Sequence, residues 1–149
     1  MRLTLHTDFA LRVLIHVGLG DGRLTTIGEV AVSFGISKSH LTKVVNRLGQ
    51  KGYLHTVRGR NGGIRLTRKP CEINIGAVVR DTEDELEILG CLHHTGYCRI
   101  ERVCVLRGIV QDAADAFLAV FDRYTLADLL EPRRALASLL LDRRSTEAG

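Results

Sequence analysis

The sequence has no apolar run that approaches the roughly 18–20 residues needed to span a membrane. No small-residue cleavage site follows its first apolar stretch, so residues 1–17 are expected to form a mature helix rather than a signal peptide. A Ser/His/Asp set, a phosphate-binding loop and a paired-carboxylate motif are also missing. These absences predict a cytoplasmic protein that neither contacts a membrane nor catalyses a reaction.

The four cysteines form no C-x₂₋₄-C pair of the kind found in structural zinc sites. They also lack the short spacings of ferredoxins, which disfavours an electron carrier. Three of them, Cys91, Cys98 and Cys104, instead follow a C-x₆-C-x₅-C pattern. In a reducing cytosol, clustered thiols favour metal binding over disulfides. The pattern therefore indicates a metal ion or an iron–sulfur cluster, with one ligand still to be supplied.

The missing ligand has several candidates, namely an exogenous small molecule or the side chains of Asp8, Cys71, His93 and His94. Cys71 is interpreted as a buried small residue. The two histidines lie inside the cysteine loop, where a solvated role is the simpler interpretation. A site with an incomplete ligand set is open to small diatomic molecules, which suits a sensor. Nearby cations that can offset the negative charge of such a site are Arg99, Arg102 and Arg107.

Charge is distributed unevenly along the 149 residues, although the net charge is only +4. Residues 1–70 carry 12 Lys and Arg against 3 Asp and Glu, a net +9, whereas residues 71–149 carry 9 against 14, a net −5. A basic first half beside an acidic second half points to nucleic acid at one end of the molecule. A solvated basic surface gives the same count, so the charge alone does not decide.

Helical spacing of apolar residues predicts three helices in the first third of the chain, over 8–19, from 25 or 26 to 34, and over 37–51. Thr7 and Ser37 are the expected N-caps of the first and third. A motif that starts at Ile27 has small Ala31 at its fifth position and Gly35 at its ninth, as a helix-turn-helix requires. The shared core is expected to contain Val30, Phe34, Ile36, Leu41 and Val44.

The third helix presents polar and cationic residues on the face opposite its apolar positions, which suits a DNA major groove. We expect DNA contacts from Ser37, Lys38, Ser39, His40 and Lys43, with Asn46 and Arg47 on the same face. A solvated amphipathic helix is the alternative, but the complete helix-turn-helix pattern favours recognition.

Residues 53–66 are expected to form two short strands around the sequence Arg58-Gly59-Arg60-Asn61-Gly62-Gly63. Asn-Gly-Gly is a strong hairpin signal because these residues tolerate positive φ. Arg58 and Arg60 at the tip are expected to reach phosphates or a minor groove. Asn61 is a further candidate DNA contact, although the turn alone also explains it.

The second half is expected to be helical over 75–81, over 105–124, and in one or two short helices within 125–141 broken near Pro132. The tail, 143–149, is expected to be disordered. Within the long helix, apolar residues in steps of four and three predict a homodimer seam, although packing within one chain is the alternative. That seam contains Leu106, Val110, Ala113, Phe117, Val120 and Tyr124.

Four segments together resemble the IscR- and NsrR-like family of iron–sulfur winged-helix repressors, over nearly the whole chain. They are MRLTLHTDFALRVLIHV (1–17), SKSHLTKVVNRL (37–48), VRGRNGGIRL (57–66) and the three-cysteine loop. HTDFALR (6–12) and YTLADLL (124–130) are most similar to the nitric-oxide-sensing, NsrR-type branch. The ligating histidine of the IscR type is replaced here by Arg107.

The resemblance implies a homodimeric repressor with an iron–sulfur cluster on Cys91, Cys98 and Cys104, [4Fe-4S] in preference to [2Fe-2S]. It further implies Asp8 of the other subunit as fourth ligand, and release of operator DNA when nitric oxide nitrosylates the cluster. Two alternatives remain, a DNA-binding regulator of iron or cluster supply or of redox stress, and an iron–sulfur enzyme or electron carrier.

The expected fold is thus mainly α with a small β-hairpin wing. Residues 1–70 would form a winged helix-turn-helix DNA-binding domain, 71–104 a connector helix and cysteine cluster loop, and 105–149 a dimerisation helix and C-terminal tail.

Overall fold

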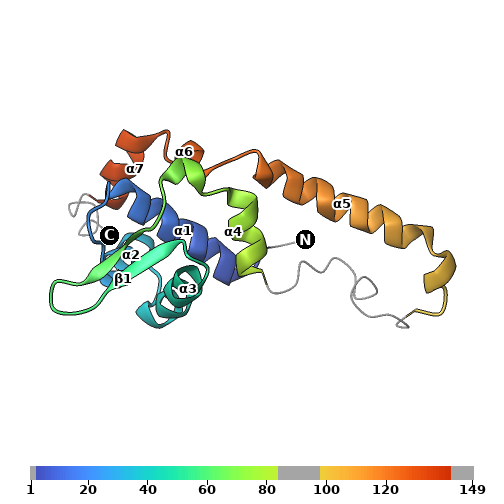
Figure 1. The fold of residues 1–149 in the computed structure, drawn as a ribbon, viewed down its shortest axis with the longest axis horizontal. Coiled ribbons are helices and arrows are strands. Elements are labelled where there is room, and N and C mark those ends of the chain that lie inside the picture. Colours follow the sequence, from blue (N-terminus) through green and yellow to red (C-terminus); the bar gives the residue numbers. More distant parts are fainter. Residues whose placement is uncertain (1–2, 84–97, 142–149) are drawn as a thin grey trace.

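The computed structural model of the chain describes residues 3–83 and 98–141, which form a globular body and a protruding helical arm (Figure 1). The body contains α1 (Leu5–Leu19), α2 (Ile27–Phe34), α3 (Lys38–Gln50), β1 (Leu54–Val57), β2 (Gly63–Leu66), η1 (Pro70–Glu72) and α4 (Ile75–Thr82). After the gap come η3 (Glu101–Val103), α5 (Val105–Asp122), α6 (Leu126–Leu129) and α7 (Arg133–Leu140). The predicted fold class is confirmed, because the described part is mainly helical with one two-stranded antiparallel sheet.

The body is built around α1, which contacts α3, α4, β2, α6 and α7. Its inward side chains, such as Val13 and Leu14, are completely buried. α2 and α3 pack on one side of it, and the hairpin is tied to the loop before α2 by a bridge between Thr25 and Ile64. The C-terminal α6 and α7 return to α1, so both ends of the described chain contribute to one core.

The start of α1 differs from the sequence prediction by three residues. Thr4, rather than Thr7, is the N-cap, and its hydroxyl accepts a hydrogen bond from the Thr7 backbone N–H. Thr7 is fully buried in the first turn, where its hydroxyl donates to the Thr82 hydroxyl of α4 at 2.9 Å. The interior contact with α4 could not be seen from local sequence, so the capping threonine was misassigned.

The helix-turn-helix matches its prediction closely. Thr26 caps α2 in a capping box with Glu29, in which each side chain accepts a hydrogen bond from the other residue's backbone N–H. Gly35 ends α2 in the left-handed region at φ 63°, as the tight turn requires. Ser37 caps α3, and the small side chain of Ala31 is buried where the helices cross.

The hairpin turn uses a different glycine from the one that the sequence indicated. β1 and β2 pair from Leu54 with Leu66 to Val57 with Gly63. The residue with positive φ in the loop is Gly59, at 109°, and neither Asn61 nor Gly62 adopts it. Gly62 is needed for space instead, because a Cβ there would overlap the Val57 carbonyl oxygen. Composition therefore located the turn, but not its left-handed position.

The arm consists mainly of α5, whose 18 residues make it about 27 Å long. Its C-terminal end is fastened to the body, since Arg80 of α4 makes a bidentate ion pair with Asp122 at 2.6 and 2.7 Å. Gly76 permits this approach, because a Cβ there would overlap the Asp122 carboxylate. The N-terminal end of α5, which follows η3, lies away from the body (Figure 1). None of the described helices has the length and apolar content for crossing a bilayer.

The last helices follow the predicted break. α6 ends before Leu130, and α7 begins directly after Pro132, which serves as its N-cap. The predicted disordered tail, 143–149, lies outside the described residues.

His16 occupies a buried polar position that the sequence did not indicate. Its Nε2 lies 3.0 Å from the Ser33 hydroxyl of α2, and that hydroxyl donates to the Leu140 carbonyl of α7 at 2.8 Å. The serine therefore accepts from Nε2–H, which leaves Nδ1 without a proton and without a partner among the described residues. Burial lowers the pKa of His16, although the nearby Glu29 carboxylate acts in the opposite direction.

We expect this histidine to make stability fall with acid. Neutral His16 stabilises the fold fully above its unfolded pKa near 6.5, and this contribution is lost as the pH falls from there toward the lowered folded pKa. The slope attributable to one proton is at most about 1.4 kcal/mol per pH unit. Denaturant unfolding between pH 7.5 and 5 gives the dependence of the free energy of unfolding on pH. We expect His16→Gln to remove the slope due to His16, and His55→Gln, at an exposed site, to retain it. Equal slopes in all three proteins would contradict the assignment.

Candidate nucleic-acid interface and cysteine site

The outer face of α3 is exposed and carries the residues predicted to contact DNA. Leu41, Val44 and Leu48 are fully buried against the body and fix the orientation of the helix. The exposed set contains Ser37, Lys38, Ser39, His40 and Lys43. Such a rigid helix with hydrogen-bonding and cationic side chains on its free face is suited to the major groove.

Three side chains on this face, those of Ser37, Ser39 and His40, have contacts within the protein. The Ser37 hydroxyl accepts from the His40 backbone N–H at 3.4 Å and lies 3.2 Å from the Ser39 hydroxyl. The His40 ring stacks on Phe9 of α1, with ring centroids 6.2 Å apart. His40 is therefore directly connected to the residue that follows Asp8.

Arg47 does not belong to the free face, contrary to its sequence interpretation. Its Nε donates to the Asp81 backbone carbonyl of α4 at 2.9 Å. It therefore serves the attachment of α3 to α4. No sequence signal indicates this, because the two residues are 34 positions apart.

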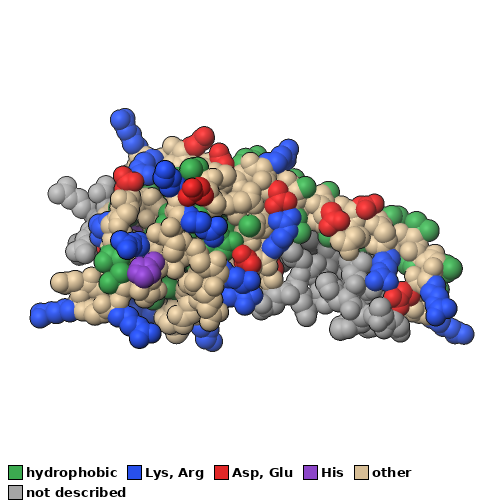
Figure 2. Space-filling model, viewed as in Figure 1, with side chains coloured by type: hydrophobic (Ala, Val, Ile, Leu, Met, Phe, Trp, Pro, Cys, Tyr) green, Lys and Arg blue, Asp and Glu red, His purple; other side chains and the backbone are tan. Residues whose placement is uncertain are grey.

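The wing places its predicted contacts on an exposed loop between β1 and β2. Arg58, Arg60 and Asn61 are all exposed there. Lys and Arg side chains follow the edge of the body formed by the hairpin and α3, whereas acidic side chains occur along α5 (Figure 2). The charge asymmetry of the sequence thus corresponds to a basic edge that carries both candidate DNA-binding elements.

The described cysteines of the predicted cluster site lie at the outer end of the arm. Cys98 and Cys104 are half-exposed free thiols, and Cys104 is the residue immediately before α5. Cys91, His93 and His94 lie outside the described residues. Cys71 is exposed on η1, so its interpretation as a buried residue is wrong.

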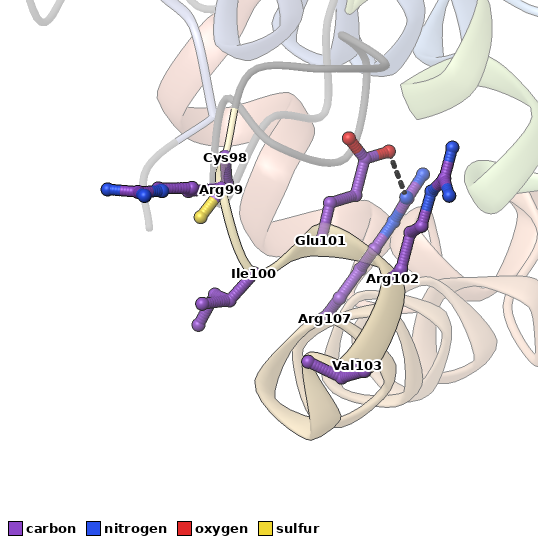
Figure 3. A pocket seen from close by; sticks show the side chains of 7 residues that line it. All are labelled: Cys98, Arg99, Ile100, Glu101, Arg102, Val103 and Arg107. Carbon is purple, nitrogen blue, oxygen red and sulfur yellow. Dashed lines mark hydrogen bonds and ion pairs between the residues drawn. The ribbon is translucent and has the colours of Figure 1, made fainter.

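Residues 98–103 and Arg107 line a hollow of about 560 Å³ at this end of the arm. Arg107 donates to the Glu101 carboxylate at 2.7 Å, and both side chains point to the same side as Arg102 (Figure 3). Arg99 points to the opposite side (Figure 3). Arg107, which stands where a ligating histidine was considered, is thus an ion-pair partner of Glu101.

The surroundings of Cys98 and Cys104 fit a thiolate-ligated group with negative charge. Neither thiol is in a disulfide, and three arginines stand within nine residues of Cys98 in the sequence, of which Arg107 is paired with Glu101. The N-terminal end of α5, directly after Cys104, adds the positive end of a helix dipole. The donor set and its charge environment therefore agree with an iron–sulfur cluster.

Asp8 is not brought to these cysteines within one chain. It belongs to the first turn of α1 in the body, where both carboxylate oxygens lie 3.0 Å from Nε of Arg12. The Arg12 guanidinium also lies over the Phe34 ring at the end of α2, 5.6 Å from its centroid. Within residues 3–83 and 98–141 of a single chain, no group of three or more His, Cys, Asp or Glu residues can hold a metal ion.

An apolar stripe remains uncovered along α5. Leu106 is 55% exposed, Ile109 58% and Val120 45%. The predicted seam differs in part, because Val110 and Phe117 are half-buried, whereas the omitted Ile109 is exposed. Sequence spacing located this amphipathic helix but not which apolar residues reach the core, since Leu118 and Phe121, outside the predicted seam, are the ones that pack against it.

Comparison with known proteins identifies relatives across the whole fold. Residues 3–132 match the Rrf2 family, described as an iron-dependent transcriptional regulator. The regulator NsrR of Geobacillus kaustophilus is 51% identical over 146 residues, which cover 97% of this chain and 99% of that relative.

Solved structures confirm the architecture. T. potens IscR is similar with a TM-score of 0.70 at 20% identity, covering 100% of this chain and 94% of that one. The global cysteine regulator CymR of B. subtilis has a TM-score of 0.67 at 23% identity, covering 87% and 95%. The chain therefore belongs to the Rrf2 family of transcriptional regulators, as a DNA-binding winged helix-turn-helix protein and not an enzyme.

Proposed function

We propose that this protein is a homodimeric repressor that senses nitric oxide through an iron–sulfur cluster and then releases its operator. The observation that carries the proposal is the separation of the outer end of α5, which Cys104 directly precedes, from α1 in the body of the same chain, which contains Asp8 (Figure 1). We propose that a second copy supplies Asp8 to complete the ligand set. The 51% sequence identity to NsrR of Geobacillus kaustophilus over nearly the whole chain supports nitric oxide as the signal.

The dimer is proposed to form along the uncovered stripe of α5. Leu106, Ile109 and Val120 lie outside the core of the single chain, and burying them between two copies removes apolar surface from water. A two-fold dimer also presents two α3 helices to two half-sites of an operator.

Cys91, Cys98 and Cys104 are proposed to hold the cluster together with Asp8 of the second copy, as [4Fe-4S] rather than [2Fe-2S]. When bound, the cluster supplies iron that reacts with nitric oxide. The protein's part is to present three thiolates, to offset their charge with nearby arginines, and to offer a carboxylate that is otherwise paired with Arg12.

The first turn of α1 is connected to both helices of the helix-turn-helix. Arg12 joins Asp8 to Phe34 of α2, and Phe9 joins the same turn to His40 of α3. A change in the partner of Asp8 would therefore act on Arg12, which contacts α2, and on a residue next to Phe9, which contacts α3.

For DNA binding, we propose that α3 enters the major groove while the wing contacts phosphates or the adjacent minor groove. The α3 contacts are Ser37, Lys38, Ser39, His40 and Lys43, and the wing contacts are Arg58, Arg60 and Asn61. The same proposal includes a cytoplasmic location. It also divides the chain after residue 70 and after residue 104 into a DNA-binding domain, a connector with the cysteine loop, and a dimerisation helix with the C-terminal tail.

The proposal is tested by titrating nitric oxide into anaerobically reconstituted protein while following visible absorbance and operator binding at fixed salt. We expect the absorbance to bleach in step with an affinity loss of about 5–150-fold, the usual range of allosteric coupling. Cluster-free protein under the same titration is the control and should not respond. Bleaching with operator binding unchanged would contradict nitric oxide sensing.

The description of the Rrf2 match as iron-dependent favours one alternative, a regulator of iron or cluster supply. That function predicts release of the operator when iron is withdrawn, with little effect of nitric oxide. The same binding assay with a chelator in place of nitric oxide separates the two.

A further inference from the structure

Three consecutive residues at the end of α4, Asp81, Thr82 and Glu83, make hydrogen bonds both to the start of α1 and to the end of α3. We call these three residues the junction. On one side the junction binds the start of α1. The Thr82 hydroxyl accepts from the Thr7 hydroxyl at 2.9 Å. The Glu83 carboxylate accepts from the backbone N–H and the hydroxyl of Thr4 at 2.7 and 3.1 Å.

On its other side the junction binds the end of the recognition helix. The Asp81 carboxylate accepts from the Tyr53 hydroxyl at 2.7 Å and from Nζ of Lys51 at 2.8 Å. The Asp81 carbonyl accepts from Nε of Arg47 at 2.9 Å. Three groups in and directly after α3 therefore converge on one residue of α4.

Because they are buried, these contacts restrict how far the start of α1 and the end of α3 can move relative to α4. Thr7, Thr82, Glu83 and Tyr53 are all buried, so their polar groups cannot exchange their partners for water without cost. Burial opposes ionisation of Asp81, but the hydrogen bonds from Lys51 and Tyr53 outweigh it and hold the pKa of this carboxyl below its usual value. The carboxylate is thus charged and held at neutral pH.

The junction is also linked to both parts of the proposed cluster site, to Asp8 through the contact of Thr82 with Thr7 and to Cys91 through the sequence. Asp8 follows Thr7 directly, and Cys91 follows Glu83 by eight residues. A displacement of the start of α1 must therefore either break its buried hydrogen bonds to Thr82 and Glu83 or move Asp81, and with it the end of α3.

We propose that the junction transmits the state of the cysteine segment to the recognition helix, with Asp81 as the positioning residue for α3. This inference rests on the proposed function, because it requires operator affinity to depend on the cluster. It adds a second connection, at the C-terminal end of α3, to the contact of Phe9 with His40 near its N-terminal end.

The test compares operator dissociation constants of cluster-loaded and cluster-free protein for the wild type, Asp81→Asn and Lys51→Gln. Asp81→Asn retains the shape of the side chain and removes its charge, and Lys51→Gln removes the ion pair from the α3 side. We expect each variant to bring the loaded-to-free affinity ratio closer to one by roughly 2- to 30-fold, the range found for residues that carry coupling. Glu131→Gln, at an exposed carboxylate after α6, should leave the ratio unchanged.

A purely structural role predicts a different result, namely equal losses of affinity in both states and a constant ratio. A constant ratio in both variants, with cluster absorbance intact, would overturn the inference. If Asp81→Asn fails to fold, Lys51→Gln and Tyr53→Phe test the same contacts from the other side. A wild-type ratio near one would instead contradict the proposed function. Amide hydrogen exchange of residues 47–53 in the wild type should also differ between the loaded and free states.

Discussion

Cys104→Ser is expected to abolish the visible absorbance of reconstituted protein and the response of operator binding to nitric oxide. Serine is nearly isosteric with cysteine, but its hydroxyl is not a soft thiolate and binds cluster iron poorly. Cys104 is half-exposed and its side chain makes no capping hydrogen bond to α5, so the fold should survive the change. Cys98→Ser should give the same result. The loaded-to-free affinity ratio should fall from about 5–150 to about one.

The matched control is Cys71→Ser, which changes an exposed cysteine on η1 in the body. It should retain both the absorbance and the response. Absorbance spectra after anaerobic reconstitution, with thermal unfolding to verify the fold, decide the matter. Full cluster loading in Cys104→Ser, or its loss in Cys71→Ser alone, would show that the assigned thiols are not the ligands.

Ile109→Glu should convert the dimer to a monomer and weaken operator binding by about 10²–10⁴-fold, because linked half-site binding would be lost. Ile109 is 58% exposed in the single chain, so a glutamate is tolerated there. In a dimer along the α5 stripe, the same carboxylate would be buried without a cation to pair with it, at a large free-energy cost. Sedimentation and operator titrations at fixed salt measure the two effects.

Gln111→Glu is the control, since it adds the same negative charge two residues away on the polar side of α5. It should remain dimeric and bind the operator with unchanged affinity. A dimeric Ile109→Glu variant would place the subunit contact elsewhere and remove the reason for assigning Asp8 of the second copy to the cluster.

Local rules explain why the helix-turn-helix was predictable. Ala31, Gly35 and Ser37 each answer a requirement set by their neighbours within a few residues: a close crossing, a left-handed turn and an N-cap. The same holds for the break at Pro132 before α7. The cysteine pattern and the charge asymmetry are likewise properties of the chain itself, and they sufficed to indicate a thiolate-ligated cofactor and nucleic acid.

Predictions that depended on distant contacts were less accurate. Thr7 is a residue type that often caps helices, yet it is buried because α4 supplies Thr82 as its partner. Arg47 has the position of a DNA contact, yet the Asp81 carbonyl of α4 engages it. In the long helix, Leu118 and Phe121 pack against the core, whereas Ile109 stays exposed, a distinction that helical spacing alone does not contain.

The helices, the wing, the basic half and the three-cysteine pattern all follow from local features of the chain, because backbone preference, periodicity and ligand chemistry act over short stretches. Tertiary packing, in contrast, separates the outer end of α5, next to Cys104, from α1, which contains Asp8, and it joins α4 to α3 through Asp81. These arrangements result from burial and from hydrogen bonds between residues tens of positions apart. Their free energy depends on how the elements pack, and packing is a property of the whole fold.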